Sequence, residues 1–382
     1  MAEWFEKRLD EIAEFNPREL LKKGSISKKI SMDKLQPFCR DVPGFELEPY
    51  SGGTKFRNGD TIMARITPCL ENGKTAKISV LETGEVGFGS TEYIVFRAKD
   101  GCDPDFLYYL VTSPIVREPA IKSMVGSSGR QRVQTDVLQT LMVKVPDLET
   151  QQSISGILKS LDDKIAANRK INDNLEQQAK ALYQRMFIDN PVSGGYMGTL
   201  SDIADITMGQ SPNGSSYNED GNGAVFFQGR AEFGFRFPSV RLYTTEPKRM
   251  ACANDTLMSV RAPVGDLNVA YTDCCIGRGL AAIHSKSNQQ SFVLYTMFSL
   301  HKQLDVFNGE GTVFGSINRT SLTELPIFIP SDREIVKFEA IVAPIDAAIR
   351  NNYEEICRLE KIRDALLPKL ISGKLDVSAV EL

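Results

Sequence analysis

The chain has 382 residues, of which 42% are hydrophobic and 25% charged, and its formal net charge is −4. A single hydrophobic core stops growing at roughly 250–300 residues, so more than one domain is expected. The composition excludes a wholly disordered chain, and the acidic balance argues against a non-specific nucleic-acid coat protein. No run reaches the roughly 18–20 apolar residues that span a bilayer, and the first residues lack the apolar core of a signal peptide. We therefore expect a cytoplasmic protein.

Cysteine and histidine limit the chemistry that the chain can perform. There are seven cysteines and two histidines, His284 and His301. No two cysteines have the C-x-x-C spacing typical of zinc sites, and only Cys274 and Cys275 are close in sequence. We expect neither a metal site nor a catalytic centre that depends on histidine.

The most informative feature is an internal repeat. The segment Asp60–Met63 returns as Asp255–Met258, and Leu138–Pro146 returns as Leu322–Pro330. From there the two copies keep a constant separation of 184 residues, as between Asp162 and Asp346 (346 − 162). This period is far longer than the roughly 20–50 residues of solenoid repeats. The chain is therefore interpreted as two copies of one module, related by an internal pseudo-twofold axis.

Each module begins with a globular part that mixes strands and helices. β-Favouring runs such as Tyr93–Phe96 and Leu325–Ile329 lie among turn-forming residues such as Asn58–Asp60. A helical stretch interrupts each copy, at Asp105–Thr112 and Gln290–Leu300. The predicted fold class is α+β, with two mixed α/β globular domains.

Each module ends in a long amphipathic helix. Apolar residues and asparagines alternate at steps of three and four over about five heptads, which is typical of a coiled coil. The predicted seam consists of Leu158, Leu161, Ile165, Asn168, Leu175 and Leu182 in the first copy and Ile345, Ile349, Asn352, Ile356, Leu359 and Leu366 in the second. A helix lying on its own globular domain is the alternative. Because Asn168 and Asn352 occupy the same seam position, we favour two helices that pack antiparallel as a rod of roughly 50 Å.

The expected domain boundaries follow from this layout. They are 1–147 and 191–330 for the globular domains, 148–190 and 331–373 for the long helices, and 374–382 for a tail. Pro344 is expected to separate a short helix from the second long helix, and Pro368 to kink or end it.

Two motifs suggest catalysis only weakly. Asn72–Thr75 resembles the end of a phosphate-binding loop, but Pro68 stands where that loop needs a glycine. Glu246 and Lys248, with an acid such as Asp220, formally fit a metal-dependent nuclease. Such a stand-alone nuclease remains an alternative function, as does a coiled-coil scaffold whose globular domains bind ligands other than DNA.

Loops in both modules carry arginine, lysine, asparagine and glutamine among glycines. Arginine reads guanine with two hydrogen bonds and asparagine or glutamine reads adenine, so these loops suit the reading of base edges. Solvated turns with ordinary surface charge are the alternative. The candidate DNA-binding residues are Arg65, Thr67, Lys74, Arg130, Gln131, Arg132 and Gln134 in the first module and Gln210, Gln228, Arg230, Arg261, Arg278, Asn318 and Arg319 in the second.

Four strings in this chain resemble the specificity subunits of type I restriction–modification enzymes. They are the segments Arg65–Ala76, Gly89–Val95, Gly126–Arg132 and Leu366–Leu375. The duplicated layout resembles that family as well, so the resemblance covers nearly the whole chain. It implies that each globular part is a target recognition domain reading one half of a bipartite DNA sequence, and that the antiparallel coiled coil sets the separation of the halves.

The same resemblance implies partners and cofactors. Methylation subunits, two of them, would dock on the helices, and restriction subunits would join that complex. S-adenosylmethionine, ATP and Mg²⁺ would belong to those partners, and this chain would be a non-catalytic subunit without a cofactor of its own. The presence of Pro344 where the first copy has Ser160 leaves the equivalence of the two docking helices open.

Overall fold

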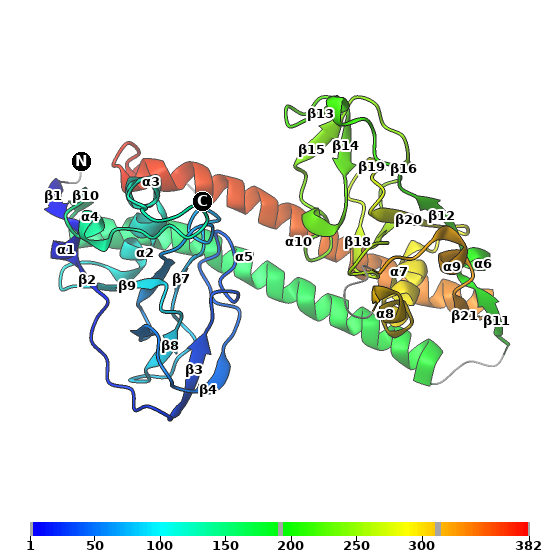
Figure 1. The fold of residues 1–382 in the computed structure, drawn as a ribbon, viewed down its shortest axis with the longest axis horizontal. Helices are drawn as coiled ribbons and strands as arrows, with labels where there is room; N and C mark the ends of the chain where they lie inside the picture. Colours follow the sequence, from blue (N-terminus) through cyan, green and yellow to red (C-terminus); the bar gives the residue numbers. More distant parts are fainter. Residues whose placement is uncertain (1–2, 190–193, 310–314, 381–382) are drawn as a thin grey trace. The chain divides into compact units, whose positions relative to one another are not determined.

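The structure is a computed structural model that describes residues 3–189, 194–309 and 315–380. The chain divides into two compact units. Unit 1 combines Met1–Arg169 with Tyr353–Leu382, and unit 2 is Lys170–Asn352. Each unit therefore holds one globular domain together with part of each long helix (Figure 1).

The globular domain of unit 1 is built on short strands. Its strands are β1 (Trp4–Arg8), β2 (Ala13–Phe15), β3 (Ile26–Ile30), β4 (Glu46–Pro49), β5 (Lys55–Phe56), β6 (Thr61–Ala64), β7 (Thr75–Lys77), β8 (Gly87–Gly89), β9 (Tyr93–Ala98) and β10 (Met142–Pro146). They form one sheet in the order β2-β9-β6-β7, a second in the order β4-β3-β8-β5, and a two-stranded antiparallel sheet β1-β10. All neighbours are antiparallel except β3 and β8.

Short helices cover the strands of unit 1. They are α1 (Leu9–Ile12), α2 (Pro104–Thr112), α3 (Pro114–Lys122) and α4 (Thr135–Gln139). Asp103 caps the start of helix α2, because its carboxylate accepts from the Phe106 amide at 2.7 Å. It buries Phe106, Tyr109 and Leu110 in the main core, where they join residues of both long helices such as Leu158 and Leu370.

Unit 2 repeats this architecture. Its strands are β11 (Tyr196–Thr199), β12 (Ala204–Met208), β13 (Tyr217–Asn218), β14 (Ala224–Phe227), β15 (Leu242–Thr244), β16 (Met250–Ala251), β17 (Thr256–Ser259), β18 (Leu267–Val269), β19 (Cys274–Ile276), β20 (Leu280–Ser285) and β21 (Pro326–Ile329). The sheet β12-β20-β17-β18 has the strand order of β2-β9-β6-β7, and the pair β11-β21 matches β1-β10. The remaining sheet is β13-β15-β14-β19-β16, whose parallel pair β14-β19 corresponds to β3-β8.

The helices of unit 2 follow the same plan. They are α6 (Leu200–Ile203), α7 (Gln290–Ser299), α8 (His301–Asp305) and α9 (Arg319–Thr323), with single 3₁₀ turns at Gly214–Ser216, Arg230–Glu232 and Val306–Asn308. Strand register confirms the duplication. Thr61 on β6 lies opposite Phe96 on β9, and the equivalent Thr256 on β17 lies opposite Ile283 on β20. The predicted α+β fold with an internal repeat is therefore confirmed.

The two long helices run antiparallel in both units. They are α5 (Leu148–Tyr183), followed by a π-helical turn (Gln184–Asp189), and α10 (Asp332–Ile371), with a 3₁₀ turn at Val377–Ala379 beyond it. In unit 1, Asp162 binds Arg363 and Asn168 binds Glu355 at 2.8 Å each, so numbers rise along one helix as they fall along the other. In unit 2, Asn172 contacts Asn352 at 2.8 Å, and the Tyr183 and Phe338 rings pack edge to face.

The predicted seam residues lie along this contact with different degrees of burial. Those that are buried are Leu158, Leu161, Ile165, Asn168, Ile349 and Ile356, and those that are half-buried are Leu175, Leu182, Ile345, Asn352, Leu359 and Leu366. At the end of α5 and in the π-helical turn after it, Tyr183 and Phe187 are buried, and Tyr183 lies one residue beyond the predicted seam position Leu182. Both rings pack against Phe292 of α7 and Phe338 of α10 in an aromatic cluster, so this end of the helix contacts α7.

The expected break at Pro344 is wrong, because α10 is continuous from Asp332 to Ile371. Pro344 is exposed, so water can satisfy the carbonyl that loses its amide partner. Pro368 lies inside the last turn without ending the helix, which continues to Ile371, and Gly373 just beyond it has φ +70°. A Cβ at Gly373 would lie 2.8 Å from the Trp4 ring, so glycine is needed there for space as well. Within the described ranges, no helix is both long and apolar enough to cross a membrane.

Candidate nucleic-acid interface

In unit 1, two candidate segments lie side by side. The Thr67 amide donates to the Gln131 carbonyl and the Gln131 amide to the Thr67 hydroxyl, both at 3.1 Å, and the Val133 amide donates to the Arg65 carbonyl at 2.9 Å. The chain after β6 is thus bonded to the chain before α4. This brings together Arg65, Thr67 and Gln131, which are far apart in the sequence. Thr67 itself is buried, and its hydroxyl serves to hold the loop.

The loop 125–132 projects from this pair of segments. Val125 and Arg132 close its base with two backbone hydrogen bonds of 3.1 and 2.9 Å. At its tip the Arg130 amide donates to the Ser127 carbonyl at 2.9 Å, and Gly129 has φ +75°, a conformation that favours glycine. The Arg130 side chain is exposed and makes no hydrogen bond or ion pair within the described part of the chain.

The other arginines of this region are occupied. Arg132 makes a bidentate ion pair with Glu92, in which the shortest N–O distance is 2.6 Å. The hydrogen bonds from Arg132 lower the pKa of the Glu92 carboxyl. The Arg65 guanidinium donates to the Val133 carbonyl at 3.2 Å. Gln134 donates to the Arg132 carbonyl at 3.3 Å. The Lys74 amine instead binds the Met32 carbonyl at 2.9 Å, so its side chain is directed to another loop.

In unit 2, four candidate residues line one open pocket of about 410 Å³. They are Gln228, Arg230, Arg261 and Arg278, and Arg241 adds a further guanidinium that sequence analysis did not single out. Arg230 pairs with Asp266 at 2.9 Å and Arg241 with Glu232 at 2.8 Å. The side chains of Arg261 and Arg278 are exposed, and neither has a partner among the residues described.

Close backbone packing builds this pocket. A Cβ at Gly277 would lie 2.9 Å from the Cα of Gln228, and one at Gly279 would lie 2.9 Å from the Gln228 carbonyl oxygen. The Arg278 amide donates to the Ser211 hydroxyl at 3.2 Å, and the Gln210 amide to the Ile276 carbonyl at 3.0 Å. Glycines on both sides of Arg278 therefore allow three loops to meet.

The segment before α9 repeats the strand-like pairing of unit 1. The Ile317 amide donates to the Val260 carbonyl at 3.1 Å and the Ala262 amide to the Gly315 carbonyl at 3.0 Å, which corresponds to the pairing of 65–67 with 131–133. Asn318 caps α9 by accepting from the Ser321 amide at 2.9 Å. Asn318 and Arg319 are exposed, and neither lines the pocket that contains Arg261.

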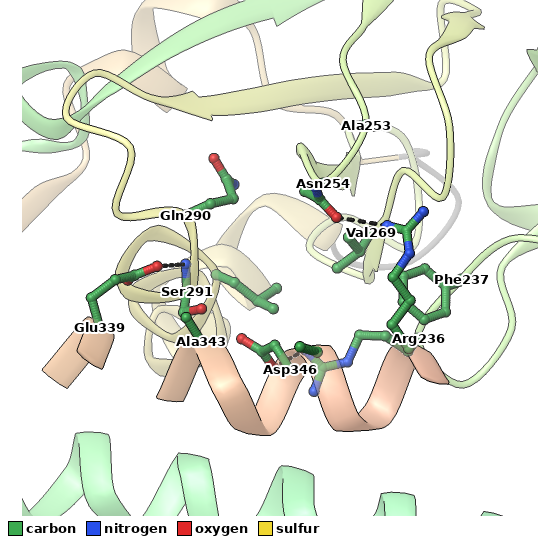
Figure 2. A pocket seen from close by; sticks show the side chains of 13 residues that line it. Arg236, Phe237, Ala253, Asn254, Val269, Gln290, Ser291, Glu339, Ala343 and Asp346 are labelled. Atoms are coloured by element: carbon green, nitrogen blue, oxygen red, sulfur yellow. Dashed lines mark hydrogen bonds and ion pairs between the residues drawn. The ribbon is translucent and has the colours of Figure 1, made fainter. Parts of the chain in front are cut away.

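A second pocket of unit 2, about 450 Å³, lies between the globular domain and α10. Figure 2 shows Asp346 beside Arg236 and Glu339 directed to Ser291; Arg236 lies 3.0 Å from Asp346, and the Ser291 amide donates to Glu339 at 3.2 Å. Arg236 also pairs with Glu176 on α5 at 3.1 Å. Arg236 thus joins α5 to α10 through two ion pairs, and Glu339 joins α10 to the start of α7, so we assign this region to packing of the domain on its helices.

The residues of the nuclease alternative do not assemble into a metal site. Asp220, Glu246 and Lys248 are all exposed. In the described ranges, the group of histidine, cysteine and acidic residues close enough to hold a metal ion is Cys252, Asp255 and His284, and it contains none of them.

Comparison with known proteins gives consistent relationships. A family profile described as the type I restriction modification DNA specificity domain matches residues 1–177. A relative from Methanocaldococcus jannaschii, a candidate MjaX specificity subunit of a type I restriction enzyme, is 31% identical over 372 residues, covering 91% of this chain and 85% of its own. The MjaIX specificity subunit of the same organism is 26% identical over 314 residues, covering 73% and 71%.

A solved structure shows the same fold. The S subunit of a type I restriction–modification system from M. genitalium superposes with a TM-score of 0.60 at 16% identity, covering 97% of this chain and 96% of the other. The predicted resemblance is confirmed by the profile and by the extent of the match to the first relative. The chain belongs to the family of type I restriction enzyme specificity subunits.

Proposed function

We propose that this chain is the sequence-reading subunit of a type I restriction–modification complex and that it binds double-stranded DNA without catalysing a reaction itself. The observation that carries the proposal is that each unit exposes arginine side chains that have no hydrogen-bond or ion-pair partner among the described residues. They are Arg130 on the loop 125–132 of unit 1 and Arg261 and Arg278 at the open pocket of unit 2. Membership of the specificity-subunit family supports the same function, and no observation favours the nuclease or the scaffold.

The chemistry of these loops suits the reading of base edges. A guanidinium can donate two hydrogen bonds to O6 and N7 of guanine in the major groove, and the Gln228 amide can pair with adenine. Arg132, Arg230 and Arg241 are held by Glu92, Asp266 and Glu232. These paired arginines shape the loops, and the unpaired ones remain available to DNA.

Two different readers in one chain imply a bipartite target. The two globular domains share strand order but carry different side chains at equivalent places, since Val260 and Arg261 stand where unit 1 has Arg65 and Ile66. In this proposal each domain reads its own half, and the length of the paired helices α5 and α10 sets the gap between the halves.

The proposal assigns the chemistry to partner subunits. Methylation subunits, two per chain to match the duplicated helices, would bring S-adenosylmethionine, and restriction subunits would bring ATP and Mg²⁺. The net charge of −4 is compatible with this arrangement if the methylation subunits supply many of the phosphate contacts.

The test is methylation mapping in cells that carry the methylation subunits with wild-type or altered forms of this chain. Removing the chain should abolish one bipartite methylation motif, and restoring it should bring the same motif back. Inserting about four residues, one helical turn, into both α5 and α10 should lengthen the gap between the half-sites. A motif that persists without the chain would refute the proposal, and an unchanged gap would refute the role of the helices.

A further inference from the structure

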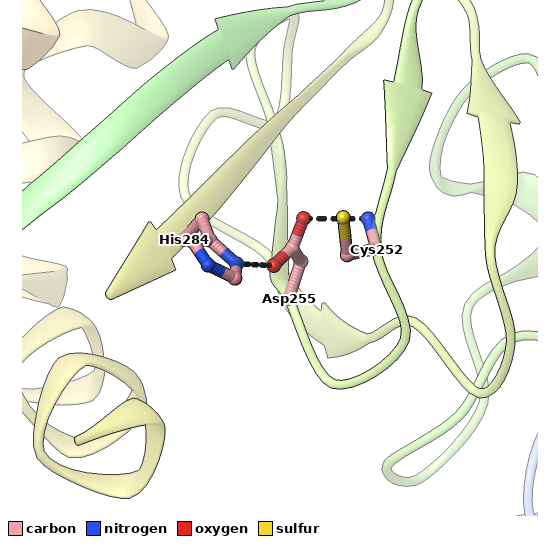
Figure 3. Close-up of side chains that lie close together, drawn as sticks. All are labelled: Cys252, Asp255 and His284. Atoms are coloured by element: carbon pink, nitrogen blue, oxygen red, sulfur yellow. Dashed lines mark hydrogen bonds and ion pairs between the residues drawn. The ribbon is translucent and has the colours of Figure 1, made fainter. Parts of the chain in front are cut away.

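Three side chains that can bind a metal ion meet in unit 2, outside the candidate DNA-reading pocket. Cys252 and Asp255 flank the turn between β16 and β17, and His284 lies on the neighbouring strand β20. Figure 3 shows them in a row, with the His284 Nδ1 2.5 Å from one oxygen of Asp255 and the Cys252 amide donating to the other at 2.8 Å. One ligand atom from each residue lies within 4.8 Å of the other two.

The corresponding place in unit 1 is an ion pair. Asp60 precedes β6 as Asp255 precedes β17, and it accepts from the Arg57 amide at 2.8 Å as Asp255 does from Cys252. Strand register places Arg97 on β9 where His284 stands on β20. The Arg97 guanidinium makes two hydrogen bonds of 2.7 Å to the Asp60 carboxylate.

Unit 2 thus keeps the buried carboxylate but replaces the cations around it. The side chain of Asp255 is 5% exposed, close to the 2% of Asp60, yet imidazole stands in place of guanidinium and a thiol in place of the Arg57 side chain. A buried carboxylate is costly without a compensating positive charge. The residue types that replace the two arginines, histidine and cysteine, are both common metal ligands, and a thiol brings no positive charge.

We propose that Cys252, Asp255 and His284 bind a borderline divalent transition-metal ion such as Zn²⁺, which takes the place of the arginine of unit 1. A thiolate, an imidazole and a carboxylate are the ligand types of zinc sites, whereas Mg²⁺ and Ca²⁺ prefer sites made of oxygen alone. Cys252 and His284 are exposed at the surface, so an ion can reach them and their side chains can adjust.

A second carboxylate lies beside the turn. Asp273 accepts from the Ala253 amide at 2.8 Å, so it adds a negative charge that a bound cation would offset. Sequence analysis did not predict this site, because Cys252 and His284 lack the short spacing of known zinc motifs.

Cobalt titration of the purified full chain tests the proposal. After treatment with a chelator, the wild-type chain should bind one Co²⁺ with a thiolate-to-cobalt charge-transfer band, and added Zn²⁺ but not Mg²⁺ should displace it. Cys252→Ser should remove that band. His284→Ala should weaken cobalt binding by at least about tenfold.

Matched variants separate loss of the site from loss of the fold. His284→Arg should rebuild the ion pair of unit 1, so it should abolish cobalt binding while keeping the melting temperature close to that of the metal-free wild type. Cys357→Ser and His301→Ala, which lie outside the cluster, should bind cobalt as the wild type does. Absence of cobalt binding by the wild-type chain, or equal binding by His284→Arg, would overturn the proposal. Neither outcome bears on DNA recognition, which is measured separately.

Discussion

The Tyr109 hydroxyl donates a 2.7 Å hydrogen bond to the Asp162 carboxylate in the interior of unit 1. The same pair recurs in unit 2, where the Tyr295 hydroxyl donates to Asp346 at 2.9 Å. Each pair joins the globular domain to the long helix of its own module. The arginine that completes the cluster differs, because Arg363 comes from α10 in unit 1 whereas Arg236 comes from the globular domain in unit 2.

Replacing Asp162 should therefore destabilise unit 1. Asp162→Ala leaves the buried Arg363 guanidinium with only its contact to the exposed Asp364, and we expect a loss of about 3 kcal/mol in unfolding free energy. Trp4 is the only tryptophan and packs against the core of unit 1, so its fluorescence during urea unfolding reports on that unit. Glu149→Gln, at an exposed position of α5 in the same unit, serves as the control and should change stability by less than about 0.5 kcal/mol. Equal stability of Asp162→Ala and wild type would contradict this role of the cluster.

The asparagines of the helix pair in unit 2 should be energetically coupled. Asn352 donates to the Asn172 side chain at 2.8 Å, and Asn172 donates to the Ile349 carbonyl at 3.2 Å. Asn172→Leu strands the Asn352 amide and should lower unfolding free energy by about 1–3 kcal/mol. The double variant Asn172→Leu with Asn352→Leu should recover much of this loss, because the apolar pair suits a helix seam. Thermal unfolding of the four proteins measures the coupling energy, and strictly additive effects would show that the two side chains act independently.

Glu339 should make stability depend on pH. Burial raises the pKa of its carboxyl above 4.5, outweighing the hydrogen bonds from the Phe292 and Ser291 amides that lower it. The protonated form is therefore favoured in the folded state, and its stabilising effect is present below pH 4.5 and is lost as pH rises through the raised pKa. Glu339→Gln keeps an acceptor oxygen without the charge. The Glu339→Gln variant should melt at a higher temperature than wild type near pH 7.5, and this difference in melting temperature should shrink toward pH 4. A difference that stays constant with pH would exclude titration of Glu339 as the cause.

Gly277 should be needed for recognition of one half-site. Its Cβ position lies 2.9 Å from the Gln228 backbone, so Gly277→Ala must push the loop carrying Arg278 away from the loop carrying Gln228. We expect this variant to recognise the half-site of unit 2 poorly, so methylation of the bipartite target should fall. The circular dichroism spectrum should stay that of the folded wild type. Gly214→Ala, where an added Cβ meets open space, is the control. Normal methylation by Gly277→Ala would show that this loop contact is dispensable.

The internal repeat could be predicted from the sequence because both copies contain the same residues at the helix seam and in the turns before corresponding strands. The seam positions Ile165 and Ile349 and the turn acids Asp60 and Asp255 are constrained by packing in each copy, so they persist at fixed separations. The break expected at Pro344 was wrong because helix propensity describes an isolated helix, whereas tertiary contacts along α10 hold this one together.

The site was predictable only in part. Residue type and neighbouring glycines were enough to select the candidate arginines. Which of these arginines form ion pairs within the protein depends on acidic residues that are distant in sequence. Glu92 lies 40 residues from Arg132, and Asp266 lies 36 residues from Arg230 (266 − 230). The same reason hid Arg241, whose place in the pocket depends on how three loops meet.

The central claim is that two different readers in one chain recognise two halves of one DNA target. The most direct measurement is genome-wide methylation mapping with Arg130→Ala, with Arg261→Ala combined with Arg278→Ala, and with the control Lys122→Ala on the exposed side of α3. The account predicts that Arg130→Ala relaxes the motif in one half only, that the double variant relaxes it in the other half only, and that Lys122→Ala leaves it unchanged. Loss or change of both halves in either variant would contradict it.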